Sequence, residues 1–174
     1  MTRFLSHIEI APGEFVETIG IEFDDMEEGL TIEHRPGFIF SWQEARRRAL
    51  IAGDRSPVLI DPVVAAEAGG GEAAIGEAWI VGAFAAATTR AFGRVVANLG
   101  WENIVFPAPV RDGDLVFAES TILGKRQSKS RPDQGIVHVL SRGVTREGVE
   151  ICRFERRFLV YRGPQEPHRR AGYV

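Results

Sequence analysis

The loop that follows residue 52 holds the side chains best suited to acid–base chemistry. It covers residues 53–62, GDRSPVLIDP. The Asp54 carboxylate could take a proton from water, and the Ser56 hydroxyl could bind a polar group of a ligand. Each has a simpler alternative, because aspartate and serine also stabilise turns. Asp61 comes directly before a proline, and this order is more typical of a helix cap than of a catalyst.

Three further side chains could take part in chemistry. His34 and His138 lie in segments predicted to be strands, and either could act as a base if the fold brought it near Asp54; a packed or solvated histidine is the alternative. Cys152 is the only cysteine, which excludes an internal disulfide and any site with several cysteine ligands. We expect this thiol to be a small buried side chain and expect no bound metal.

The segment before the loop is predicted to be a helix. Ser41 and Glu44 have the spacing of a capping box, and alanines follow at helical intervals up to residue 52. Gly53 is well placed to end this helix. A short helix is predicted from Asp61 to about residue 68. The glycines at 69–71 then form a loop that lacks the spacing of a phosphate-binding motif.

A second helix is predicted over residues 78–97. Its first twelve residues carry no charge and are rich in alanine, so we expect this helix to be buried on all sides. Arg90 and Arg94 would then mark its solvated end. The arginines at 46–48 cover much of the first helix; a solvated face is the default, and the alternative is that at least one of them faces a partner subunit or a ligand.

The rest of the chain is predicted to form strands. The candidates are residues 103–106, 115–123, 134–144 and 149–161, with a shorter strand near 30–34 and an extended run at 38–40. In the last strand, Cys152, Phe154, Phe158 and Val160 alternate with the charged Arg153, Glu155 and Arg157. A buried helix followed by antiparallel strands predicts an α+β fold.

Length and composition limit the range of functions. The 174 residues suit a single domain, with a core over about residues 20–162 and terminal extensions at 1–19 and 163–174. The net charge of −3 argues against nucleic acid or an anionic membrane as a partner. We see no leader sequence and no apolar run approaching the ~20 residues of a membrane span, so we expect a cytoplasmic protein.

Several segments together resemble one known family. Residues 53–62 are similar to the pattern Gly-Asp-x-Asn-Pro-[Leu/Ile]-His-x-Asp, with Leu59 in place of the histidine. Residues 23–29, 33–37, 98–110 and 129–137 are similar to other segments of the same proteins. The chain thereby resembles the MaoC-like acyl dehydratases and enoyl-CoA hydratases. This implies a hot-dog fold, in which a curved antiparallel sheet wraps a long helix, and it points to branched or dicarboxylic acyl-CoA substrates.

The resemblance also implies roles for particular residues. In the family, the loop aspartate and histidine act together on water; Asp54 matches the aspartate, but Leu59 can neither accept nor donate a proton. Gly82 follows Val81 where the family has a His-Gly pair, and its amide would polarise the thioester carbonyl. Ser56 stands where asparagine or histidine is usual. The basic residues Arg126, Lys129 and Arg131 would meet the phosphates of coenzyme A, which is part of the substrate rather than a separate cofactor.

Three functions remain open from the sequence. The first is a hydratase or dehydratase that adds water to an enoyl thioester, or eliminates it, and works as a homodimer. The second is a non-catalytic subunit that binds acyl thioesters, pairing with a catalytic hot-dog partner in a heterodimer; Leu59 and Val81 favour it. The third is a thioesterase on the same scaffold. The carrier could be coenzyme A or acyl carrier protein.

Overall fold

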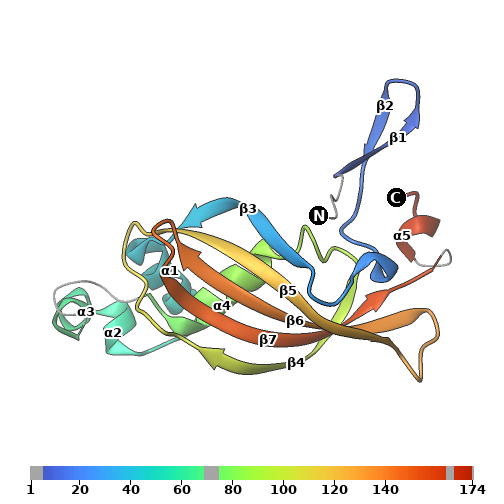
Figure 1. Ribbon diagram of the computed structural model, residues 1–174. Coiled ribbons are helices and arrows are strands. Elements are labelled where there is room, and N and C mark those ends of the chain that lie inside the picture. Colours follow the sequence, from blue (N-terminus) through green and yellow to red (C-terminus); the bar gives the residue numbers. More distant parts are fainter. Residues whose placement is uncertain (1–5, 69–74, 164–166, 174) are drawn as a thin grey trace.

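The computed structural model describes residues 6–68, 75–163 and 167–173. Five antiparallel strands form the main sheet, in the order β3-β5-β6-β7-β4. Their bounds are Thr31–Ile39 for β3, Val95–Val105 for β4, Leu115–Gln127 for β5, Gln134–Thr145 for β6 and Glu150–Tyr161 for β7. The sheet curves around helix α4, Glu77–Ala87 (Figure 1). The α+β fold class is confirmed.

The remaining elements lie at the two ends of this sheet. Helices α1 (Trp42–Ala52), α2 (Pro57–Ile60) and α3 (Pro62–Ala68) cluster at one end, as Figure 1 shows. At the other end lie the 3-10 helix Phe23–Asp25, the short helix α5 (Pro167–Arg170) and a projecting hairpin of β1 (His7–Ala11) and β2 (Glu14–Glu17). The sequence analysis did not predict this hairpin. The glycine loop predicted at 69–71 lies outside the described residues.

The start of α1 is capped differently from the prediction. The Ser41 side chain makes no capping hydrogen bond. Instead, the Trp42 amide donates to the Asp112 carboxylate over 2.6 Å, across 70 residues of sequence. Glu44 does not reach back to Ser41 but pairs with the arginines that follow it on α1. Gly53 ends the helix as predicted, in a left-handed conformation at φ 75°.

Helix α4 is shorter than the predicted 78–97. The Thr88 and Thr89 hydroxyls donate to carbonyls of its last turn, and the chain then turns and enters β4 at Val95. Nor is α4 buried on all sides, because Ala78, Gly82 and Ala86 are exposed. The predicted solvated end is also wrong for Arg94, which is 2% exposed.

The core lies between α4 and the concave face of the sheet. Phe84 of α4 presses against β6, where a Cβ on Gly143 would lie 2.1 Å from the phenyl ring. Only glycine fits at this contact. The last strand alternates as predicted, with Phe154 and Phe158 buried and Arg157 exposed. The exception is Arg156, which points into the core and is 5% exposed.

Candidate functional site

A large cavity lies at the α1–α3 end of the sheet, and the loop that the sequence singled out lines it. Its volume is about 750 Å³. Asp54, Ser56 and Leu59 line it from one side, and the first residues of α4 line it from the other. The remaining walls are largely apolar. They comprise Ala45, Ala49, Ile51, Ala52, Val58, Ile75 and Trp79, with Arg47 and Arg48 beside them.

Asp54 lines this cavity while it also stabilises the loop. One carboxylate oxygen, Oδ1, accepts the Ser56 amide over 2.9 Å, and the Asp54 amide donates to the Ala49 carbonyl of α1. The two explanations for Asp54 are therefore compatible, because a turn contact fixes the carboxylate in the cavity wall. Ser56 precedes α2, and its hydroxyl makes no capping bond there. Asp61 caps α3 by accepting the Val63 amide over 2.9 Å, as predicted.

The start of α4 brings backbone N–H donors to the same cavity. The Trp79 and Ile80 amides donate to the Gly76 carbonyl, whereas the Glu77 and Ala78 amides have no acceptor among the described residues. Such amides at a helix start, together with the helix dipole, favour a negatively charged oxygen. Gly82 lies six positions into α4, where the helix itself accepts its amide. Gly82 does not line this cavity, whereas Glu77, Ala78 and Trp79 at the start of α4 do.

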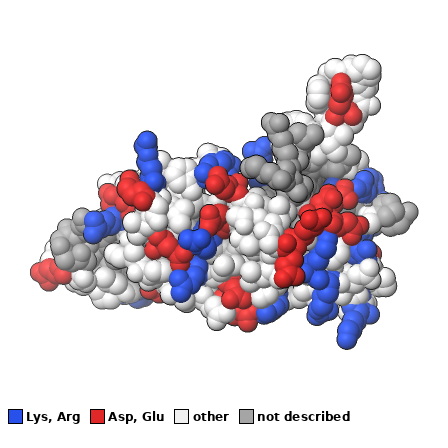
Figure 2. Space-filling view, in the orientation of Figure 1, with Lys and Arg blue, Asp and Glu red and all other residues white. Residues whose placement is uncertain are grey.

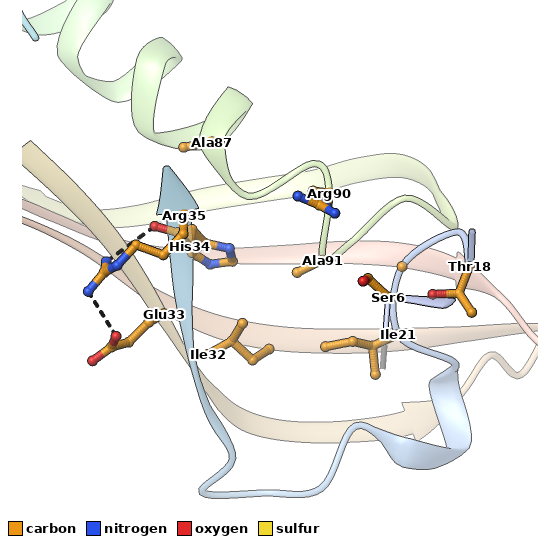
Figure 3. A pocket seen from close by; sticks show the side chains of 11 residues that line it. Ser6, Thr18, Ile21, Ile32, Glu33, His34, Arg35, Ala87, Arg90 and Ala91 are labelled. Carbon is orange, nitrogen blue, oxygen red and sulfur yellow. Dashed lines mark hydrogen bonds and ion pairs between the residues drawn. The ribbon is translucent and has the colours of Figure 1, made fainter. Parts of the chain in front are cut away.

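Neither candidate histidine lies in this cavity. His34 lines a different cavity, of about 250 Å³, near the far end of α4 (Figure 3). Its ring points toward Arg90 and Ala91, while Arg35 turns the other way to pair with Glu33. His138 lies at a third depression, beside Arg126 and Arg157. No described residue that lines the Asp54 cavity is a histidine.

His34 is held neutral by its surroundings. It is 5% exposed, and its Nε2 is 2.9 Å from the Ser120 hydroxyl, which in turn lies 2.9 Å from the Ser141 hydroxyl. Burial and, to a smaller extent, the charge of Arg156 lower the pKa of His34 to about 4. Burial also lowers the pKa of Arg156 to about 10; its guanidinium lies over the Phe92, Trp101 and Phe158 rings.

Cys152 is buried completely, as expected. Burial, with smaller contributions from the charges of Glu150 and Glu77, raises the pKa of its thiol to about 12. A thiol with this pKa stays protonated at neutral pH. It therefore lacks the thiolate that a cysteine nucleophile requires.

The predicted coenzyme A contacts lie at the other end of the sheet from Asp54. Arg126 is the last residue but one of β5, and Lys129 and Arg131 lie in the turn to β6, opposite α1–α3 (Figure 1). Basic side chains project from this end of the molecule, with acidic ones beside them (Figure 2). Since β5 has 13 residues, ~40 Å of strand separates its ends. These residues do not join Asp54 within one chain.

One group of possible metal ligands escaped the sequence analysis. Glu102, His138 and Glu155 come from three neighbouring strands, and their ligand atoms lie within 4.8 Å of one another. These side chains already have partners, since His138 Nε2 is 2.7 Å from a Glu155 oxygen and Arg157, outside the group, pairs with Glu102. Only strand register could reveal this group, because the residues are far apart in the sequence.

Comparisons with known proteins place the chain in a family. The family model described as mesaconyl-CoA hydratase matches residues 13–171. The chain belongs to the mesaconyl-CoA hydratase family. Its structure is that of the MaoC-like hot-dog proteins, so the resemblance noted from the sequence is confirmed. No curated protein matches the sequence.

Solved structures agree with this assignment. A putative MaoC domain protein dehydratase from Chloroflexus aurantiacus J-10-fl shares 26% identity at a TM-score of 0.77, over 85% of this chain and 42% of that one. A MaoC-like dehydratase from Rhodospirillum rubrum shares 23% identity at a TM-score of 0.72, over 83% of this chain and 99% of that one. A Mycobacterium tuberculosis protein with a double hot-dog fold shares 22% identity at a TM-score of 0.76, over 84% of this chain and 46% of that one. This chain therefore spans less than half the length of the first and third proteins.

No membrane-spanning helix is found among the described residues, since none is both long and apolar enough.

Proposed function

We propose that this hot-dog domain adds water to an enoyl thioester, or removes it from the 3-hydroxyacyl form, in the Asp54 cavity. The observation that carries the proposal is the convergence of Asp54, Ser56 and the start of α4 on one cavity of about 750 Å³. Family membership supports the reaction class. Branched or dicarboxylic acyl-CoAs are the substrates that we favour.

The cavity meets the main needs of this reaction. Apolar walls, including Leu59 and Trp79, would enclose the acyl chain and exclude bulk water. The Glu77 and Ala78 amides, which have no acceptor among the described residues, would bind the thioester oxygen as it gains negative charge. The Asp54 oxygen that the Ser56 amide does not occupy would accept a hydrogen bond from the attacking water.

Turnover assays test this proposal directly. Purified protein is mixed with linear, branched and dicarboxylic enoyl-CoA thioesters while loss of the conjugated chromophore and release of thiol are followed together. We expect chromophore loss without thiol release. Asp54→Asn should reduce kcat about 100-fold or more, because it removes the negative charge that holds and polarises the attacking water, an effect on the order of losing an acid–base group. Thiol release would instead identify a thioesterase.

Asp61→Asn is the matched control for Asp54→Asn. It makes the same chemical change in the same loop, and asparagine caps a helix as well as aspartate does. Because Asp61 contacts α3 rather than a ligand, its activity should match that of the wild type. Equal losses in the two variants would contradict a specific role for Asp54.

A second candidate function is supported by Leu59. This side chain lines the cavity where the family pattern has a histidine, and no described cavity residue is a histidine. The chain would then bind acyl thioesters without converting them. Binding of a saturated acyl-CoA, without turnover of any enoyl-CoA, would favour this function over the first.

We also propose that the domain pairs with a second hot-dog unit, a copy of itself in the simplest case. Strand β4 is hydrogen-bonded to β7 alone and so forms an open edge of the sheet. Leu99, Ile104 and Val105 are exposed on it, and open apolar edges are normally covered. Sedimentation analysis should show a dimer that Leu99→Lys weakens. A wild-type monomer at micromolar concentration would contradict the pairing.

A further inference from the structure

We propose that Glu77 is a second catalytic residue of the Asp54 cavity and supplies the proton transfer that Leu59 cannot. The inference rests on the hydratase function proposed above. Water addition requires a group that takes a proton from water and a group that gives one to the α-carbon. Among the described residues that line the cavity, Asp54 and Glu77 are the two carboxylates, and there is no histidine.

Glu77 lies next to the place that the family histidine would occupy. It is the first residue of α4, directly after Gly76. The tip of Leu59 packs against that glycine, since a Cβ built on Gly76 would lie 3.2 and 3.4 Å from the two Leu59 methyl carbons. A side chain at position 59 therefore ends beside the backbone that carries Glu77. Glu77 and Leu59 thus both belong to the lining of this cavity.

The Glu77 carboxylate is not committed to a structural contact. It makes no hydrogen bond or ion pair with the other described residues. Arg47 and Arg48, which line the same cavity, both pair with Glu44, at 2.8 and 2.9 Å. Glu77 is thus an exposed carboxyl group at the cavity wall that no described cation pairs with.

One carboxylate can complete the reaction while the other positions the water. Asp54 accepts a hydrogen bond from one O–H of the water, and Glu77 accepts the proton of the other. The water oxygen bonds to the β-carbon, and the π electrons of the double bond move to form an enolate that the α4 amides stabilise. Glu77 then returns its proton to the α-carbon. The carbonyl reforms, and both carboxylates end the cycle ionised.

The test compares the Glu77→Gln variant with a control variant and with a double variant. Glu67→Gln is the matched control, because Glu67 is an exposed glutamate on the neighbouring helix α3 and does not line the cavity. Leu59→His/Glu77→Gln restores the family histidine. We expect Glu77→Gln to lower kcat about 100-fold or more with KM and the Kd of a saturated acyl-CoA nearly unchanged. Glu67→Gln should match the wild type, and the double variant should regain activity.

The outcomes separate this inference from the proposed function. If the wild type is active and Glu77→Gln is equally active, the inference is wrong while the hydratase function stands. If the wild type is inactive and Leu59→His alone creates activity, Glu77 does not replace the histidine and the inference is overturned. Binding of acyl-CoA without turnover by any of these proteins would overturn both.

Discussion

Protonation of His34 should make the fold sensitive to acid. Its pKa is lowered from 6.5 to about 4, chiefly by burial and then by the charge of Arg156. In the unfolded chain His34 takes up a proton near its ordinary pKa, whereas in the folded chain it resists until about pH 4. The unfolded state therefore binds more protons between these values, and the free energy of unfolding falls as pH decreases from 6.5 to 4.

The size of this effect follows from the shift. A difference of one pKa unit corresponds to 1.36 kcal/mol, so the full shift is worth about 3 kcal/mol below pH 4 and about 2 kcal/mol at pH 5. Urea unfolding at pH 7 and pH 5 measures it, using the wild type, His34→Gln and His7→Gln. Glutamine keeps a hydrogen-bonding group near Ser120 but does not titrate. His7, on β1, is exposed and serves as the control.

We compare how much stability each protein loses between the two pH values. Other titrating groups are common to all three and cancel in the comparison. His34→Gln should lose about 2 kcal/mol less than the wild type, and His7→Gln should lose as much as the wild type. An equal loss in the wild type and His34→Gln would refute the argument that buried, neutral His34 couples folding to pH.

Two further predictions concern the core. Gly143→Ala should lower the free energy of unfolding, measured in urea, by about 1–3 kcal/mol because the added Cβ would strike the Phe84 ring. Gly124→Ala is the control, since Gly124 also lies on a strand but an added Cβ would meet nothing within 4 Å. Equal losses in the two variants would contradict the packing argument. Cys152 should resist a thiol reagent at pH 8 in the folded protein and react quickly in urea, because its pKa is raised to about 12 by burial and by nearby acidic charge; rapid labelling of the native protein would show that the thiol is accessible.

Local sequence patterns predicted three of the strands and the first helix. The strands over 115–123, 134–144 and 149–161 were located within a few residues, because alternating apolar residues and turn glycines act over short distances. The first helix and its end at Gly53 were predicted for the same reason. Its cap was not, since the acceptor is Asp112, far along the chain.

The predictions were wrong where contacts between distant parts of the chain determine the local structure or the burial of a residue. The helix predicted over residues 78–97 was too long, since its last residues form a turn and the start of β4. Residues from 95 onward pair with β7, a strand more than 50 residues later. Arg94 was expected in solvent, and Arg156 was not considered, yet the fold buries both. Aromatic rings around the Arg156 guanidinium offset part of the cost of burial. No pattern in the sequence indicates these surroundings.

The sequence by itself determined the fold class, the family resemblance and the candidate loop with Asp54, because these depend on residue order and short spacings. It also showed that Leu59 replaces a histidine. Only the tertiary structure decided which side chains share a cavity with that loop. The fold places Glu77 there, puts His34 and His138 at other pockets, and leaves the basic residues near Arg126 at the opposite end of the sheet. Such neighbours are separated by tens of residues and are set by strand register and helix packing, which no local pattern specifies.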